Sequence, residues 1–316
     1  MAAQYLILKN ISISNANAIA GFTYGFPAVT HFLGYVHALS RKLQQSHGIR
    51  LDDVGIMCHQ HQVHAYRENQ YEPYSFALTR NPVTDPKSIG KFIKDGTPQA
   101  IVEEGRMHLT VSLVIKASGI NIVSEQIRDE QCAVIKALAE RHKLAGGRIT
   151  SIDSCELAKS DCHKAILRRL LPGFVLRERS ELLVAKNEQS GSSLGNWLDF
   201  SALKFAATDE PLSDSDESGK VKWGKVAKPK GYLVPIQIGY KQIAPTYSAG
   251  EVANVRDNQT PVSFVEAVHS IGEWVGAPSK LESLQEIMWQ YYYQAPFYVC
   301  RTQDGPMDDK ELDFDF

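Results

Sequence analysis

QYLILKNISIS, residues Gln4–Ser14, alternates apolar and polar side chains in the way that a half-buried β-strand does. Apolar residues dominate its odd-numbered positions, from Tyr5 to Ile13, and its even-numbered positions become polar toward Ser14. We therefore expect a strand here, with its odd positions forming the more apolar face. The segments that follow decide what kind of sheet this strand joins.

The next segment reads as a helix, because apolar side chains recur at the helical period from Phe32 to Leu43. We expect Thr30 to cap its N-terminus. Patterning then predicts a helix, two strands, a helix and a short strand at Thr30–His47, Leu51–Tyr66, Met107–Ala117, Ser124–Leu144 and Arg148–Asp153. With the first strand this order is βαββαβ, so we expect an α+β fold, ferredoxin-like or RRM-like. Its four-stranded antiparallel sheet would carry two helices on one face and leave the other face bare for single-stranded RNA.

The second half of the chain gives weaker signals. Helices are predicted at Ser192–Phe205, Val262–Gly276 and Lys280–Tyr293, and Pro235 places the strand Tyr232–Tyr240 at a sheet edge. We therefore expect a first domain at 1–155 with an inserted arm at about 67–106. A C-terminal β/helical elaboration at 156–300 with a mobile loop at about 208–230, and an acidic tail at 301–316, would follow it.

Composition excludes several classes of protein. The net charge of −2 argues against nucleic-acid binding along the whole surface, but it leaves room for a local basic groove. No apolar run reaches the length of a membrane span, and the N-terminus does not resemble a secretion signal. The five cysteines, including Cys58 and Cys300, have irregular spacing. They fit reduced thiols, so we expect a cytoplasmic protein without contact to a membrane.

The stretch CHQHQVH, Cys58–His64, is the densest group of side chains that could carry chemistry. Zinc would need convergent ligands and a second ligand pair, which the sequence lacks. Polar rungs on an RNA-facing sheet or structural histidines remain open. No phosphate-binding or dinucleotide glycine motif is present, so we expect neither a metal nor a cofactor. His37, His59 or His108 could still serve as a general base on an RNA 2′-hydroxyl.

Amide and basic side chains near the predicted turns are the candidate RNA contacts. Amides both donate and accept hydrogen bonds and can read base or sugar edges, while arginines hold phosphates. Each side chain could equally be a solvated turn residue. The candidates are Asn15, Asn17, Arg41, Arg80, Asn81, Arg106, Arg148, Arg168 and Arg169.

Several stretches carry a resemblance to a known family. They are NANAIAGFTYGFPAVTHFLGYVHAL (Asn15–Leu39), VGIMCH (Val54–His59), LTRNP (Leu78–Pro82), AIVEEGRMHLTVSL (Ala100–Leu113), RRLLPGF (Arg168–Phe174), YLVPIQIGY (Tyr232–Tyr240) and GEVANVRDNQTPVSFVEAV (Gly250–Val268). The chain resembles the second Csy subunit, the Cas-five-type protein of the type I-F CRISPR surveillance (Csy, or Cascade) complex, from Gln4 to about Trp274. The acidic segment near Ser213 and the acidic tail are not part of this pattern.

The resemblance implies a fold of the RAMP superfamily and a non-catalytic role in antiviral defence. It implies that the chain holds the 5′ handle of the CRISPR RNA, pairs with the large Csy subunit and contacts the first backbone Csy subunit. Target DNA would then be selected by base pairing with the guide. Two alternatives remain open: a metal-independent endoribonuclease acting on repeat RNA, and a protein–protein adaptor that never touches RNA.

Overall fold

The computed structural model describes residues 4–80, 86–96, 103–120, 124–159, 163–189, 191–208, 222–255, 257–276 and 281–302. Its helices are α1 (Val29–His47), α2 (Pro86–Asp95), α3 (Glu125–Ala139), α4 (His163–Arg169), α5 (Ser180–Asn187), α6 (Ser193–Ser201) and the short 3-10 helix η2 (Leu284–Ile287). The main sheet is built from β1 (Gln4–Asn17), β4 (Arg50–Val63), β9 (Arg106–Ser118), β10 (Lys143–Leu144), β11 (Gly147–Lys159), β12 (Phe174–Glu178), β15 (Leu233–Gln242), β16 (Val265–Val275), β17 (Met288–Gln294) and β18 (Phe297–Thr302).

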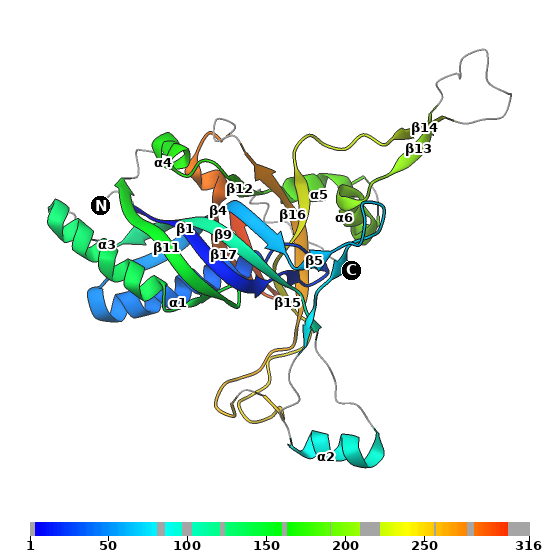
Figure 1. Ribbon diagram of the computed structural model, residues 1–316, viewed down its shortest axis with the longest axis horizontal. Helices are drawn as coiled ribbons and strands as arrows, with labels where there is room; N and C mark the ends of the chain where they lie inside the picture. Colours follow the sequence, from blue (N-terminus) through cyan, green and yellow to red (C-terminus); the bar gives the residue numbers. More distant parts are fainter. Residues whose placement is uncertain are drawn as a thin grey trace.

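Ten strands form this sheet, in the order β10-β11-β1-β9-β4-β12-β16-β15-β18-β17, and each of the pairings described in it is antiparallel (Figure 1). β17 also pairs with β4, at Val54 and Gly55, while β12 pairs with β4 at Met57 and Cys58. The second half of the sheet therefore closes into a ring that begins and ends on β4. The expectation of a mixed α+β fold is confirmed, with a sheet much larger than four strands.

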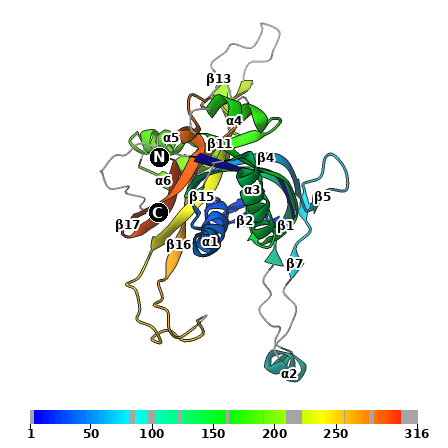
Figure 2. The same ribbon diagram turned by 90° about the vertical axis from the view of Figure 1, so that its left-hand side faces the viewer.

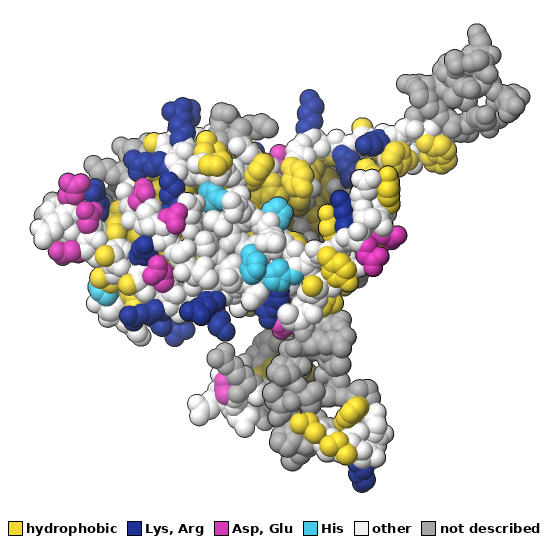
Figure 3. All heavy atoms as spheres, in the orientation of Figure 1, with side chains coloured by type: hydrophobic (Ala, Val, Ile, Leu, Met, Phe, Trp, Pro, Cys, Tyr) yellow, Lys and Arg dark blue, Asp and Glu magenta, His cyan; other side chains and the backbone are white. Residues whose placement is uncertain are grey.

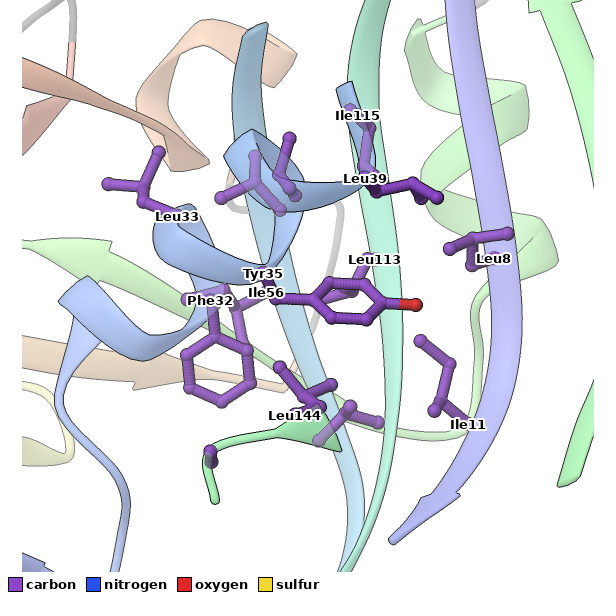
Figure 4. Close-up of a cluster of buried hydrophobic side chains, with 14 of the residues drawn as sticks. Leu8, Ile11, Phe32, Leu33, Tyr35, Leu39, Ile56, Leu113, Ile115 and Leu144 are labelled. Atoms are coloured by element: carbon purple, nitrogen blue, oxygen red, sulfur yellow. The ribbon is translucent and has the colours of Figure 1, made fainter. Parts of the chain in front are cut away.

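The main core lies between this sheet and helices α1 and α3, which cover one of its faces (Figure 2). Figure 4 shows Phe32 and Tyr35 of α1 beside Ile56 of β4 and Leu113 of β9. The hydroxyl of buried Tyr35 donates to the carbonyl of Ala139 at 3.2 Å, so this polar atom keeps a hydrogen bond inside the core. Each helix is thus fixed by its apolar stripe rather than by surface contacts.

Two bulges in β1 change which side of the strand is buried. Asn10 and Asn15 have φ angles of 50° and 56°, and the register against β9 shifts at both. Before Asn10 the even-numbered Leu8 faces the helices, and after it the odd-numbered Ile11 does. Ile7 lies in a second core on the opposite face. Apolar side chains at odd-numbered positions are therefore buried on both sides of the bulge, as expected, but in cores on opposite faces of the sheet.

Only one end of the second sheet face is covered. There α4 and η2 pack against the sheet, and Ile166 and Leu284 join Tyr5 and Met57 in the second core. Over the other end of β11, β1, β9 and β4 no described helix lies on this face (Figure 2). The fold therefore leaves a stretch of sheet surface free for a ligand.

Three segments project from the body (Figures 1 and 2). The first lies between β4 and β9 and carries the ladders β5 (Ala65–Tyr66) with β6 (Ser75–Phe76) and β7 (Thr79–Arg80) with β8 (Glu103–Glu104), as well as α2. The second is the hairpin of β13 (Phe205–Thr208) and β14 (Lys222–Lys225). The third is the connection from β15 to β16, which extends in the same direction as α2. A fourth ladder, β2 (Ile19–Ala20) with β3 (Thr23–Tyr24), stays close to the body.

Several predicted elements of the first half change at their ends. Helix α1 follows Ala28, which makes no side-chain cap, so Thr30 is not the N-cap. Ser124 does cap α3 and accepts from the Ile127 N–H at 3.2 Å. That helix ends at Ala139, and the residues expected to form its last turn instead make strand β10. The short strand expected after it is the long β11.

The two helices predicted at Val262–Gly276 and Lys280–Tyr293 are wrong, because the described residues of these segments form β16, η2 and β17. Buried strands in a ring are apolar on much of their surface, and their pattern is hard to tell from that of a buried helix. Pro235 lies in β15, which has β16 on one side and β18 on the other. On β15 the described pairing with β18 covers Gly239–Lys241, so Pro235 lies outside this paired stretch. Among the described residues, no helix has the length and apolarity needed to cross a membrane.

Candidate nucleic-acid interface

A shallow groove of about 510 Å³ crosses the open end of the second sheet face. It runs over β11, β1, β9 and β4, and we call it the polar groove. Its lining consists of Ser12, Ile13, Ser14, Gln60, His61, Gln62, His108, Leu109, Thr110 and Thr150. Most of these side chains carry hydroxyl, amide or imidazole groups and no fixed charge. The groove can therefore offer both donors and acceptors to a polar ligand.

Strand register places the polar side chains of the groove in rungs. Thr110 on β9 lies opposite Ser12 on β1 and opposite Gln60 on β4. The next rung brings His108 opposite Gln62. Opposed residues on neighbouring strands point to the same side of a sheet, so these rungs lie across the groove. The same face is apolar at the end covered by α4 and η2 and polar at the open end.

A chain of hydrogen bonds fixes the boundary between these two ends. The backbone N–H of Asn10, at the first bulge, donates to Ser112 Oγ at 2.9 Å. Ser112 Oγ lies 2.7 Å from His59 Nε2, and His59 Nδ1 lies 2.6 Å from the Pro172 carbonyl oxygen. A carbonyl only accepts, so Nδ1 donates to Pro172, while Nε2 and the Ser112 hydroxyl share the second hydrogen bond. Both nitrogens of His59 are thus engaged in hydrogen bonds within the fold.

His64, His108 and His37 differ from His59 in their surroundings. His64 packs edge-on against His108, with ring centroids 4.6 Å apart, and His108 Nδ1 accepts from the Asn15 N–H at 3.3 Å. Partial burial, together with the nearby His108, lowers the pKa of His64. His37 projects from α1 on the helix-covered side of the sheet, away from the groove. The three candidate general bases, His37, His59 and His108, are therefore not gathered in one place.

Asn15, Asn17, Arg106 and Arg148 come together at one rim of the polar groove. Arg106 pairs with Glu104 and donates to the Asn15 carbonyl oxygen at 3.3 Å. Arg148 is exposed and lies opposite Ser14 in the register of β1 and β11. The Asn17 amide is already used, since its Nδ2 donates to the Ile19 carbonyl and its Oδ1 accepts from the Ile19 N–H. Beside this rim lies a second hollow of about 430 Å³, lined by Asn17, Ile19, His31, Glu104, Arg106 and Gly146.

The other predicted contacts lie farther from the groove. Arg168 and Arg169 are exposed at the end of α4, over the covered end of the same face, and Arg169 lies 3.7 Å from Glu156. Arg41 is exposed on α1, on the opposite side of the sheet. Arg80 lies in β7, opposite Glu103 of β8 in the register of that two-stranded ladder.

Parts of the sequence prediction fall outside the described residues. They include Asn81, the acidic segment Asp209–Glu217 and residues 303–316 of the predicted acidic tail, whose first two residues belong to β18. Within the described ranges, no three His, Cys, Asp or Glu side chains gather in a way that could hold a metal ion.

Sequence analysis considered the stretch of Gln60 and Gln62 as polar rungs, but it did not single out the hydroxyl side chains of the groove, namely Ser12, Ser14, Thr110 and Thr150. The signal was present in the strand patterns, where one set of alternate positions becomes polar near the strand ends. Serine, threonine and glutamine are common on any exposed strand, so the pattern alone does not separate a ligand groove from an ordinary solvated face.

Fold and site together define a mixed α+β protein on a large antiparallel sheet, with a polar, hydrogen-bonding groove on the sheet's open face. The family model described as CRISPR-associated protein (Cas_Csy2) matches residues 6–300. The chain is also 33% identical over 315 residues to the CRISPR-associated protein Csy2 of Pseudomonas aeruginosa (strain UCBPP-PA14), across 92% of each chain. The chain belongs to the Csy2 family of CRISPR-associated proteins.

Proposed function

We propose that this chain is a non-catalytic RNA-binding subunit of a type I-F CRISPR surveillance complex, and that it holds the 5′ handle of the CRISPR RNA in the polar groove. The observation that carries this proposal is the groove itself. It is an open sheet surface of rungs that donate and accept hydrogen bonds, with Arg106 and Arg148 at its rim. Single-stranded RNA presents base edges, 2′-hydroxyls and phosphates to such a surface.

The side chains of the site would contact different parts of the RNA. Arg148 is exposed and can reach a phosphate, while Arg106 can do so only by sharing its guanidinium with Glu104. Asn15 has an exposed side chain that can read a base or sugar edge. Asn17 uses its amide internally, so it shapes the loop after β1 instead of reading the RNA. Arg168 and Arg169 lie on the same face and can extend the path of the strand.

The topology supports a ferredoxin-like core of the RAMP type. Strands β1, β4, β9 and β11, interleaved with α1 and α3, follow the order βαββαβ and lie in the sheet as β11-β1-β9-β4. That spatial order, 4-1-3-2 in chain numbering, is the one expected of the ferredoxin-like motif, with both helices on one face. We propose residues 1–155 as this unit, with the α2 arm inserted, and residues 156–300 as the elaboration that forms the ring.

Partner subunits of the complex are proposed for the projecting segments. The α2 helix exposes Ile89, Phe92 and Ile93 to solvent, which a lone protein seldom does on a projecting helix. We propose that this arm and the neighbouring β15–β16 connection contact the large Csy subunit or the first backbone Csy subunit. Target DNA would then meet the complex through base pairing with the guide.

The alternative, a metal-independent endoribonuclease, has less support. A general base must have a nitrogen free to take a proton, and both nitrogens of His59 are engaged. Incubating the purified chain with labelled repeat RNA in the absence of metal tests the alternative. Site-specific cleavage that is lost in His108→Ala would support it, and intact RNA would reject it.

The groove is tested in the reconstituted complex with the double variant Gln60→Ala, Thr110→Ala. Both residues lie on one rung, and loss of two hydrogen bonds of about 1 kcal/mol each should weaken RNA retention roughly 10-fold or more. The matched control is Gln44→Ala, Gln45→Ala, two exposed positions on α1. Native mass spectrometry gives the RNA occupancy and circular dichroism the fold. Equal occupancy in both double variants would contradict the proposal.

A further inference from the structure

A second cavity opens directly beside the polar groove, where β4 diverges from β12 and β16. It has a volume of about 550 Å³. We call it the aromatic pocket, and its aromatic residues are Tyr24, Phe26, Phe174, Tyr232 and Trp274. In Figure 3, hydrophobic side chains gather in a hollow next to histidines near the centre of the visible face. Nothing described above assigns this pocket a role.

The deep wall of the pocket is rigid. Trp274 packs edge-on against Phe26, with ring centroids 4.8 Å apart, and Phe26 stacks on the buried Phe32 of the core at 5.6 Å. Trp274 is also held in β16, where its backbone N–H donates to the Tyr232 carbonyl at 3.0 Å. The inner surface is therefore preformed and needs little rearrangement to accept a flat ligand.

Exposed aromatic rings line the mouth of the pocket. Phe174 is 54% exposed and Tyr232 is 69% exposed, which leaves two large rings in contact with water. Burying them against a ligand would be favourable, because apolar surface removed from water contributes to binding. Phe174 is the first residue of β12 and Tyr232 directly precedes β15, so the two rings come from different segments and can contact a ligand from two sides.

The aromatic pocket and the polar groove share His61, which lines both. A strand lying in the groove therefore passes the mouth of the pocket. Polar atoms inside are few: Gln237 is 6% exposed, and Thr23 lies at the edge. This combination of flat apolar walls and a few polar groups is suited to a nucleobase, which has two apolar faces and a polar rim.

We infer that one base of the RNA held in the polar groove turns away from its neighbours and inserts into the aromatic pocket. The inference rests on the proposed function and makes it more specific, since it names the part of the RNA that the pocket takes. Stacking accepts any base, whereas His61 and Gln237 offer hydrogen bonds to its edge. One turned-out base would also fix the register of the RNA along the groove.

The test uses the RNA recovered from the assembled complex, resynthesised with a single abasic nucleotide at each position in turn. Each RNA is bound to the complex containing the unchanged chain or the double variant Phe174→Ala, Tyr232→Ala. At one position, loss of the base should weaken binding to the unchanged complex roughly 10-fold, the typical worth of one stacked base. The same abasic RNA should cause no further loss with the double variant.

Tyr293→Ala is the matched control, because this ring is 68% exposed on β17 and lines neither cavity. It should leave the abasic profile unchanged. If RNA binds but no abasic position couples to the pocket variant, the inference is overturned while the polar groove still stands. A pocket variant that loses a partner subunit while retaining RNA also overturns it, because the pocket then holds a protein side chain. If no RNA binds to the complex, the proposed function fails with it.

Discussion

At the scale of single residues, asparagines decide which side chains reach the groove. Asn10 adopts a positive φ and turns the strand over, so that Ser12 and Ser14 point to the open face while Ile11 and Ile13 enter the core. Asparagine tolerates this backbone conformation better than most residues do. The sequence shows the asparagine but not the bulge, because the apolar residues on both sides continue one alternating pattern. The sequence therefore predicts only some of the residues that line the groove.

His269 gives a prediction about pH. This residue is 3% exposed, and its Nε2 accepts from the Phe22 N–H at 3.2 Å. Burial lowers the pKa of His269 below its ordinary value of 6.5. As pH falls below 6.5, the unfolded chain takes up a proton that the folded chain resists, so this residue lowers the free energy of unfolding in acid. His269→Gln, which keeps an acceptor but does not titrate, should show a shallower loss of stability from about pH 7 to about pH 5.

Urea unfolding at several pH values measures this difference. His37→Gln, at an exposed position on α1, removes one imidazole without touching the buried site and serves as the control. Identical pH slopes for the unchanged chain and His269→Gln would show that burial of this ring is not coupled to protonation.

At the scale of elements, periodicity predicted the parts of the fold that have one buried face. α1 and β9 each carry an apolar stripe opposite a polar one, and both were predicted within a residue or two of their ends. β16 and β17 were predicted as helices. Both lie in the ring, where β16 pairs with β12 and β17 pairs with β4 as well as with β18. Local pattern carries little information about pairing with the distant strands β12 and β4.

Glu178 of β12 links two strands of this ring, β12 and β18. Its carboxylate is buried and accepts from the Thr302 N–H at 2.7 Å and from Ser180 Oγ at 2.6 Å, and it lies 3.3 Å from Arg301 Nε. Glu178→Ala leaves a buried N–H and a buried hydroxyl without this acceptor, and it takes away the carboxylate beside the half-buried guanidinium of Arg301. The free energy of unfolding should fall by about 3–5 kcal/mol. Glu188→Ala, at an exposed position after α5, should change it by less than about 0.5 kcal/mol.

Urea denaturation measures the free energy of unfolding of both variants. A loss below about 1 kcal/mol in Glu178→Ala would mean that water or neighbouring groups replace the carboxylate without cost.

At the scale of the whole molecule, the low net charge agrees with the neutral lining of the polar groove. The chain has a net charge of −2, and its groove is lined by neutral side chains, so few cations are available to hold phosphates. RNA affinity should therefore depend only weakly on salt, with Arg148 as one of the few phosphate contacts. Each phosphate contact on a single strand changes the slope of log K against log salt by about 0.7.

Arg148→Gln tests this arrangement. The variant should lower the salt slope of RNA binding by about 0.7, measured by titrating the reconstituted complex with RNA at several salt concentrations. Arg41→Gln lies on the helix-covered side and should leave the slope unchanged. If Arg41→Gln has the larger effect, the RNA runs over the opposite face.

The position of β4 couples the stability of the groove sheet to the stability of the ring. β4 hydrogen-bonds to β9 on one flank and to β12 and β17 on the other, so this one strand belongs both to the sheet of the groove and to the ring. Separating the groove sheet from β4 breaks its hydrogen bonds to β9, and opening the ring at β4 breaks its hydrogen bonds to β12 and β17. An RNA strand bound on β4 would stabilise both the groove sheet and the ring, because a ligand that binds only the intact form raises the free energy needed to open either part. Proteolytic lifetime should then be set by guide occupancy, and an empty subunit should be cleared sooner than a loaded one.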